Sequence, residues 1–280
     1  MCSSIAKGSE EAQFVEVPSI DLVTLLLTLF SMAIGVWFVK SGHANLPHRG
    51  YLDPAITPTM AILLCGAMFI LAGIGGWWGF NHVPEQQSTI VGTAWMIGSS
   101  MAAQIPVVLL YAKFRRKCSS RHILPVSVIA FMVFVPLTLA VAGLAHILFA
   151  RLGLESPTDI GHKTLEQIVH TPWSSATWVV IVCVTIGAGI FEEVMYRGLL
   201  LPTFVAVFGG KSVWRAMYAT SALFAIMHIG AAQPSAIIGL FILSVGLCWA
   251  RVKSGGVLAP VLIHIIFNAM NIAFVYSTKI

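Results

Sequence analysis

The sequence contains few charged residues. Only 10% of its 280 residues are charged, 58% are hydrophobic, and the mean hydropathy is +0.88. A soluble domain has roughly 25% charged and about 45–50% apolar residues, so this chain has too few charges to cover a water-exposed surface. The composition excludes an ordinary cytosolic enzyme, a disordered regulator and a disulfide scaffold. It predicts an all-α fold, a polytopic membrane helical bundle.

Several motifs of common catalytic and metal sites are also absent. The five cysteines form no CxxC pair, which argues against a disulfide framework and a zinc knuckle. There is no GxSxG around a nucleophilic serine and no HExxH. No internal repeat is present, and inverted repeats are typical of transporters. The acidic N-terminus lacks the positive region of a cleavable signal peptide.

Apolar runs predict about eight transmembrane helices, since a helix needs about 20 apolar residues to cross a bilayer. The runs in the first half are Leu22–Val39, Ala55–Phe80, Ser88–Ala112 and Ile123–Ala150. The second half has a run from Trp173 that meets charge at Glu192, then Val213–Ile229, Pro234–Ala250 and Val257–Tyr276.

The basic residues of the loops predict the orientation of the chain. Eleven lie in four alternate loops: Lys40 and Arg49; Lys113, Arg115, Arg116, Lys117 and Arg121; Lys211 and Arg215; Arg251 and Lys253. The other loops and the tails hold only Lys7, Arg151, Lys163 and Lys279. By the positive-inside rule, both termini face outside, in the cell membrane if the protein is prokaryotic. The net charge of +5 therefore reflects orientation, and we expect no nucleic acid partner.

One long loop, residues 151–172, divides the chain. Residues 1–150 are predicted to form an N-terminal four-helix membrane region of unassigned role. Residues 173–280 are predicted to form a second four-helix region, which contains the unusual polar residues.

Two adjacent carboxylates, Glu192 and Glu193, interrupt an apolar stretch. A carboxylate at the bilayer centre costs at least about 2.5–3.5 kcal/mol and marks a functional site by default. The alternative is that the helix ends at Ile190 and leaves the pair at the interface. The chain is apolar again over Leu199–Phe208, which favours a continuous helix.

Helical spacing separates the two acids. Glu193 and Arg197 are i,i+4 and within reach of an ion pair, whereas Glu192 lies about 100° around the helix and has no cation in its own turn. We therefore predict a supporting role for Glu193 and Arg197, and a chemical role in proton transfer for Glu192. A contact between Arg197 and the substrate backbone stays open.

Two of the nine histidines, His228 and His264, lie inside apolar segments. His146, near a span end, is expected to be structural or interfacial. The other six are expected to be solvated loop residues: His43, His48, His82, His122, His162 and His170. A lone buried histidine is more often a satisfied core group than a catalyst, but two of them beside a diacidic pair favour catalysis.

The turn at Gly209-Gly210 predicts that Glu192 and His228 meet. Glu192 precedes Gly210 by 18 residues and His228 follows it by 18. On neighbouring antiparallel helices, both then lie roughly 25 Å from the turn. The pair is predicted to activate a water molecule.

His264 and Asn268 are i,i+4 on the last span, and both can donate hydrogen bonds to a developing oxyanion. Asn268 alone would be read as interhelical glue. With Glu192 and His228, the set fits hydrolysis of an acyl bond, most simply a peptide bond. A zinc site of Glu192, His228 and His264 is an alternative. We favour it less, because a metal would not need Asn268 or Arg197.

Three ordered motifs carry a resemblance to a known family: Glu192-Glu193-x-x-x-Arg197, Phe224-x-x-x-His228 and His264-x-x-x-Asn268. They resemble those of the CAAX prenyl protease and bacteriocin-processing family, the ABI-type intramembrane endopeptidases, which include the type II CAAX prenyl proteases. The similarity covers about residues 175–275, and every motif position is filled.

The resemblance implies roles for these residues. Glu192 and His228 would activate water, His264 and Asn268 would form the oxyanion site, and Glu193 and Arg197 would support it. The implied mechanism is glutamate-based and needs no cofactor. The implied partner is a membrane-associated protein or peptide, which for eukaryotic members is a prenylated CAAX protein.

Two other classes of function remain open at this stage. One is a non-catalytic membrane protein of the same fold that serves binding or self-immunity. The other is a proton-coupled transporter that uses Glu192 and His228 as a relay, against which the lack of inverted repeats counts. The sequence does not indicate the oligomeric state.

Overall fold

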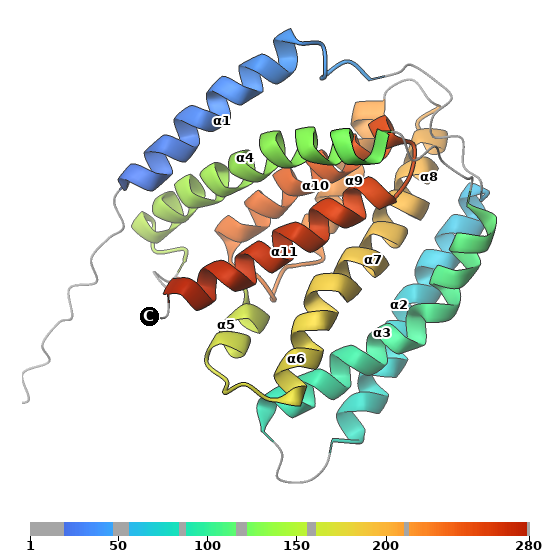
Figure 1. The fold of residues 1–280 in the computed structure, drawn as a ribbon. Coiled ribbons are helices and arrows are strands. Elements are labelled where there is room, and N and C mark those ends of the chain that lie inside the picture. The colour runs from blue at the N-terminus through green and yellow to red at the C-terminus, as the bar shows by residue number, and fades with distance from the viewer. Residues whose placement is uncertain are drawn as a thin grey trace, which may run out of the picture.

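The computed structural model describes residues 20–46, 56–83, 88–115, 122–155, 161–209 and 213–278. Within these ranges the chain is almost entirely helical, and β-pairing is limited to isolated bridges. Seven helices in this part of the chain are long and apolar enough to cross a membrane. They are α1 (Leu22–Lys40), α2 (Pro58–Asn81), α3 (Thr89–Phe114), α4 (Ile123–Arg151), the long helix Ser175–Val207, α10 (Pro234–Ser254) and α11 (Leu258–Thr278). The predicted all-α membrane bundle is confirmed (Figure 1).

The remaining one of the eight predicted spans, Val213–Ile229, is a shorter helix than expected. Helix α9 runs from Val213 to Ile226, 14 residues, which is about 21 Å and less than the hydrocarbon core of about 30 Å. The chain leaves the helix just before His228. It turns at residues 227–233 and returns along α10, so α9 packs against α10 inside the bundle.

The long helix Ser175–Val207 does not end at Ile190. It passes from α6 (Ser175–Val182) through a π-helical turn, η2 (Cys183–Gly187), to α7 (Ala188–Glu193). A second π-helical segment, η3 (Val194–Leu200), leads into α8 (Leu201–Val207). Glu192 and Glu193 therefore lie within a membrane-length helix. Wide turns of this kind inside helices frequently occur at functional sites.

Helix α10 lies at the centre of the bundle, packed against α4 and α9 (Figure 1). Small residues permit this packing: a Cβ on Gly239 would lie 2.9 Å from Cβ of Ala142 on α4. Trp249 of α10 is buried in the same core and meets Phe38 of α1 edge-on. The core thus joins helices from both halves of the chain.

Helices α2 and α3 run side by side along one edge of the bundle (Figure 1). Gly75 and Gly79 of α2 face the backbone of α3 at Ser99 and Trp95, where any Cβ would clash. Small residues four apart commonly let two membrane helices approach closely. Helix α2 also contacts η3, so this N-terminal pair forms a wall beside the acidic helix.

The loop after α4 is anchored to the start of α10. The buried carboxylate of Glu155 accepts hydrogen bonds from the backbone N–H and hydroxyl of Ser235, at 3.2 and 2.5 Å. His146 Nδ1 lies 3.2 Å from the same carboxylate, so the structural role expected of His146 is confirmed. A short helix, α5 (Lys163–Val169), follows this loop.

Some sequence-based expectations lie outside the described residues. These are the basic residues Lys7, Arg49, Arg116, Lys117, Arg121, Lys211 and Lys279, together with His48, Ala55 and Gly210. The orientation of the chain and the division into residues 1–150 and 173–280 stay predictions.

Candidate active site

Two cavities meet at Glu192 and His228, and both residues line both cavities. One cavity, of about 680 Å³, lies between the α2–α3 pair and the long helix; we call it the apolar cavity. The other, of about 390 Å³, is lined by α3, α4, α5, α9, α10, α11 and the long helix; its lining is also mainly apolar, and we call it the polar cavity after the four catalytic candidates that line it. Both volumes are within the range of small-molecule pockets in proteins.

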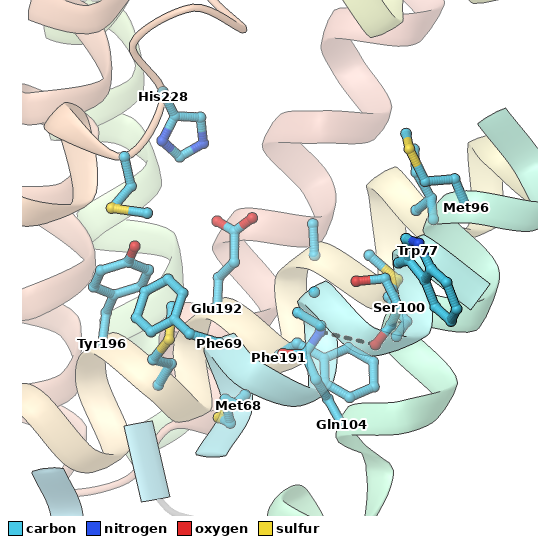
Figure 2. Close-up of a pocket in the computed structure, with 18 of the residues that line it drawn as sticks. Met68, Phe69, Trp77, Met96, Ser100, Gln104, Phe191, Glu192, Tyr196 and His228 are labelled. Carbon is cyan, nitrogen blue, oxygen red and sulfur yellow. Dashed lines mark hydrogen bonds between the residues drawn. The ribbon is translucent and has the colours of Figure 1, made fainter. Parts of the chain in front are cut away.

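The apolar cavity is lined mainly by methionine, aromatic and glycine residues from α2, α3 and the long helix. Its lining includes Met68, Phe69, Gly73, Gly76, Trp77, Met96, Met101, Phe191, Met195 and Tyr196. Figure 2 shows the Glu192 side chain directed toward the side of this cavity where His228 lies. Gln104 and Ser100 of α3 place a polar edge on the opposite side.

The polar cavity brings together the four residues predicted to be catalytic. Glu192 comes from α7, His228 from the turn after α9, and His264 and Asn268 from α11. These residues are separated by up to 76 positions along the chain. The arrangement matches the depth argument made from the turn at Gly209-Gly210, although His228 lies just beyond its helix.

Glu193 and Arg197 form a fully buried ion pair, with Arg197 Nη1 2.7 Å from Glu193 Oε1 and no exposed side-chain surface on either residue. Arg197 Nη2 donates to the hydroxyl of Ser244 on α10, at 2.6 Å, and to its carbonyl, at 3.2 Å. The guanidinium also lies over the ring of Phe224, 4.8 Å from its centroid. Arg197 lines neither of these two cavities, and its contact with the substrate backbone stays an untested expectation.

His264 lies between the two acids. Its Nδ1 is 2.8 Å from Glu193 Oε1, and its Nε2 is 3.9 Å from Glu192 Oε2. Because a carboxylate can only accept, Nδ1 carries a proton in this contact. Nε2 can therefore donate a hydrogen bond only when the ring is an imidazolium.

His228 has the same tautomer as the neutral His264 ring. Its Nδ1 lies 2.8 Å from the carbonyl oxygen of Phe224, one turn back, and a carbonyl also only accepts. The neutral ring therefore keeps its proton on Nδ1 and leaves Nε2 as an acceptor. This hydrogen bond fixes the ring at the junction of the two cavities.

Asn268 is held by the π-helical turn η2. Its Nδ2 donates to the carbonyl of Val184 at 2.8 Å. In an α-helix that carbonyl would accept from the N–H of Ala188, but Ala188 bonds instead to the carbonyls of Cys183 and Thr185. The wide turn thus frees a carbonyl that fixes Asn268 against the long helix.

A glycine lets α11 approach the acidic helix. A Cβ on Gly189 would lie 2.6 Å from Cγ1 of Ile265, the residue next to His264. Gly189 is one turn before Glu193, so this close approach sets the distance between His264 and Glu193.

Among the described residues, no three His, Cys, Asp or Glu side chains are grouped so as to hold a metal ion. The alternative zinc set of Glu192, His228 and His264 lines one cavity but is not arranged as a ligand cluster in this part of the chain. The donors present do not fit a preformed metal site, and metal dependence stays a matter for experiment.

The structure adds site residues that the sequence did not indicate. His162, expected to be a solvated loop histidine, is partly buried and lines the polar cavity, so that expectation is wrong for this residue. Ser244 holds Arg197, and α2 and α3 line the apolar cavity. No periodicity or spacing pointed to these contacts, because each joins elements far apart in the chain.

Comparison with known proteins finds a family similarity in the C-terminal part of the chain. Residues 173–270 match the model of a family described as type II CAAX prenyl endopeptidase, Rce1-like. A protein of Escherichia coli, described as an uncharacterized 24.3 kDa protein, is 23% identical over 221 residues, 74% of this chain and 95% of the relative. No solved structure matches the chain.

All seven motif residues, from Glu192 to Asn268, fall inside the matched segment, which therefore contains the whole predicted catalytic set. The resemblance inferred from the three motifs is confirmed over residues 173–270, which are similar to the Rce1-like family of type II CAAX prenyl endopeptidases.

Proposed function

We propose that the protein is an intramembrane endopeptidase that hydrolyses peptide bonds of membrane-associated substrates. Glu192 and His228 activate the attacking water, and His264 and Asn268 stabilise the oxyanion. The observation that carries this proposal is that Glu192 and His228 line both cavities, so a peptide passing from one cavity to the other crosses this pair.

The His228 tautomer supports its role beside Glu192. With Nδ1 bound to the Phe224 carbonyl, the Nε2 lone pair is available to accept a hydrogen bond from water. Glu192 Oε2 is buried and has no hydrogen-bond partner among the described residues, so it is available to take a proton. Water then adds its oxygen to the carbonyl carbon, and the proton held by Glu192 passes to the leaving amine nitrogen as the C–N bond breaks.

His264 and Asn268 suit the oxyanion because both present nitrogen donors to the same cavity. Glu193 holds His264 through Nδ1, which directs Nε2 toward Glu192. As an imidazolium, His264 donates from Nε2 to negative charge that develops beside Glu192. Asn268 is positioned by its bond to Val184, and its amide carries a second N–H.

The lining of the apolar cavity favours a substrate that carries an apolar group to hold it there. Methionine side chains adapt to irregular apolar surfaces, and the lining supplies several of them, together with aromatic rings. A lipidated or strongly apolar peptide segment fits this lining. CAAX-type processing, in which a C-terminal segment is removed after a prenylated cysteine, is the form of the activity that we propose.

The test uses the purified full-length chain in lipid nanodiscs and a farnesylated peptide that ends in the C-a-a-X pattern. We expect Glu192→Gln and His228→Gln each to lower cleavage by about 10²–10⁴-fold, the usual contribution of a general base. The matched control is Glu166→Gln, because Glu166 is an exposed acid of α5. Unchanged cleavage by Glu192→Gln would overturn the proposal.

A cellular comparison separates the other functional classes. Membrane proteomes of cells carrying wild type and Glu192→Gln should differ in uncut substrates. A non-catalytic binding or immunity protein would keep its cellular function with Glu192→Gln. A transporter would instead show Glu192-dependent proton flux in liposomes without peptide cleavage.

A further inference from the structure

His162, the residue that caps α5, lines the polar cavity. The segment 161–163 pairs with the turn after His228: Lys163 N–H donates to the Ala231 carbonyl at 3.1 Å, and Gln233 N–H donates to the Gly161 carbonyl at 2.9 Å. His162 and Ala232 form an antiparallel bridge between these bonds. The N–H of Ala232 in turn donates to the carbonyl of His228. His162 is thus fixed by backbone contacts to the turn that carries His228.

The ring of His162 is held in one tautomer. Its Nδ1 caps α5 by accepting a hydrogen bond from the backbone N–H of Thr164 at 3.3 Å. A backbone N–H can only donate, so the neutral imidazole carries its proton on Nε2. Burial lowers the pKa of His162 below its ordinary value of 6.5, and the nearby charge of His228 lowers it further. Near neutral pH, His162 is therefore an uncharged donor.

One polar group in the cavity lacks a hydrogen-bond partner among the described residues. Thr138 of α4 is 3% exposed and lines the polar cavity. Its hydroxyl has no hydrogen-bond partner among the described residues. A buried hydroxyl without a partner is costly, and it marks a place where a polar ligand atom would be stabilised.

The charged and titratable lining determines what such a ligand can be. Glu192, His228 and His264 lie together at one part of this cavity, and no lysine or arginine is among its described lining residues. A ligand that enters must offer acceptors to neutral donors such as His162. The carbonyl and carboxylate oxygens of a peptide are acceptors of this kind.

We propose that His162 binds the peptide segment on the leaving-group side of the scissile bond, by donating a hydrogen bond from Nε2 to one of its carbonyl or carboxylate oxygens. Thr138 Oγ1 assists from α4. The apolar cavity holds the anchored part of the substrate, and the polar cavity holds the part that is released. This inference rests on the proposed peptidase function, and it concerns a residue outside the matched segment 173–270.

Two variants separate substrate binding from capping. His162→Asn keeps an acceptor near the position of Nδ1, because asparagine is a good N-cap, but it loses the donor at Nε2. His162→Gln places an amide donor near the position of Nε2 but loses the cap. Both are compared with wild type in full-length chain, together with Thr138→Val, which removes only the hydroxyl.

The experiment measures kcat and KM on two farnesylated C-a-a-X peptides of one sequence, ending in a carboxylate or an amide. We expect His162→Asn to raise KM by about 10-fold, the effect of one hydrogen bond to a polar or charged acceptor, with kcat little changed. His162→Gln should keep KM near that of wild type. An effect confined to the carboxylate peptide identifies the C-terminal carboxylate as the acceptor, and an equal effect on both identifies a backbone carbonyl.

The inference is overturned if His162→Asn leaves KM unchanged for both peptides, or if His162→Gln is impaired as much as His162→Asn. A parallel binding measurement keeps it independent of turnover. Peptide affinity is measured in chains that carry Glu192→Gln, with and without His162→Asn, and about 10-fold weaker binding is expected with the second change. If wild type cleaves neither peptide, that result counts against the proposed function but not against the role of His162. The binding measurement then tests the role of His162 separately.

Discussion

His264 Nδ1 lies 2.8 Å from Oε1 of Glu193 in the interior of the bundle. The same carboxylate oxygen accepts from Arg197 at 2.7 Å. One acid thus holds a cation on its own helix and an imidazole on α11. The second acid of the pair, Glu192, is left to face both cavities.

This division predicts different outcomes for Glu192→Gln and Glu193→Gln. Glu192→Gln should lower cleavage by about 10²–10⁴-fold without lowering the melting temperature, because Glu192 pairs with no cation on its own helix. Glu193→Gln should destabilise the protein by about 3–5 kcal/mol, because it leaves Arg197 buried without a counter-charge. Thermal unfolding in detergent, followed by tryptophan fluorescence, measures the second effect. Equal melting temperatures for the two variants would contradict the division.

The Arg197 network predicts non-additive stability effects. Arg197→Met alone should be strongly destabilising, because it leaves the Glu193 carboxylate buried and unpaired. Adding Glu193→Gln should recover part of the loss, since replacing both members of a buried pair is often tolerated. Ser244→Ala should cost only about 1 kcal/mol, because the Ser244 carbonyl still accepts from Arg197. A double-mutant cycle by thermal unfolding tests this; simple additivity of the Arg197 and Glu193 changes would refute it.

Gly189→Ala should impair both stability and cleavage. The added Cβ would lie 2.6 Å from Ile265 Cγ1, and overpacking of this kind costs about 1–3 kcal/mol. The forced shift of α11 would also move His264 away from Glu193 and lower kcat. Gly35→Ala on α1 is the matched control, because nothing lies within 4 Å of a Cβ there. Full activity of Gly189→Ala would show that the close approach is not needed.

The lowered pKa of His162 predicts a pH dependence of stability. Between the folded pKa and the ordinary value of 6.5, the unfolded chain binds more protons than the folded one. Stability therefore rises with pH in that interval and is lost as the pH falls below about 6.5. His228, Glu192 and His264 line the same cavity, and all three are retained when His162 is replaced. The melting temperature of wild type should fall more steeply below pH 6.5 than that of His162→Asn, and parallel curves would contradict this assignment.

Chelation should leave cleavage unchanged. The described residues contain no grouped set of metal ligands. We expect the rate to persist after treatment with a strong chelator and dialysis, measured with the farnesylated peptide. Loss of cleavage, restored by added zinc, would instead favour the metal mechanism with Glu192, His228 and His264 as ligands.

Local spacing was sufficient for part of the site. The i,i+4 rule placed Arg197 beside Glu193, and the ion pair is present. Glu192 and His228 are equally far along the sequence from the predicted turn, which predicted that they lie at one depth. Both residues line the same two cavities. The length of α9 was predicted less well, because the apolar run continues past Ile226 while the backbone already turns before His228.

The sequence by itself determined that this is a membrane bundle with two acids inside a helix, because helix periodicity and the cost of buried charge act locally. Only the tertiary structure decided the tautomers of His228 and His264, the anchoring of Asn268 on Val184 and the entry of His162 into the polar cavity. The His264, Asn268 and His162 contacts join residues about 70 or more positions apart. Their partners depend on how the helices pack, on π-helical turns and on glycines such as Gly189. The spacing of residues in the sequence predicts none of these features.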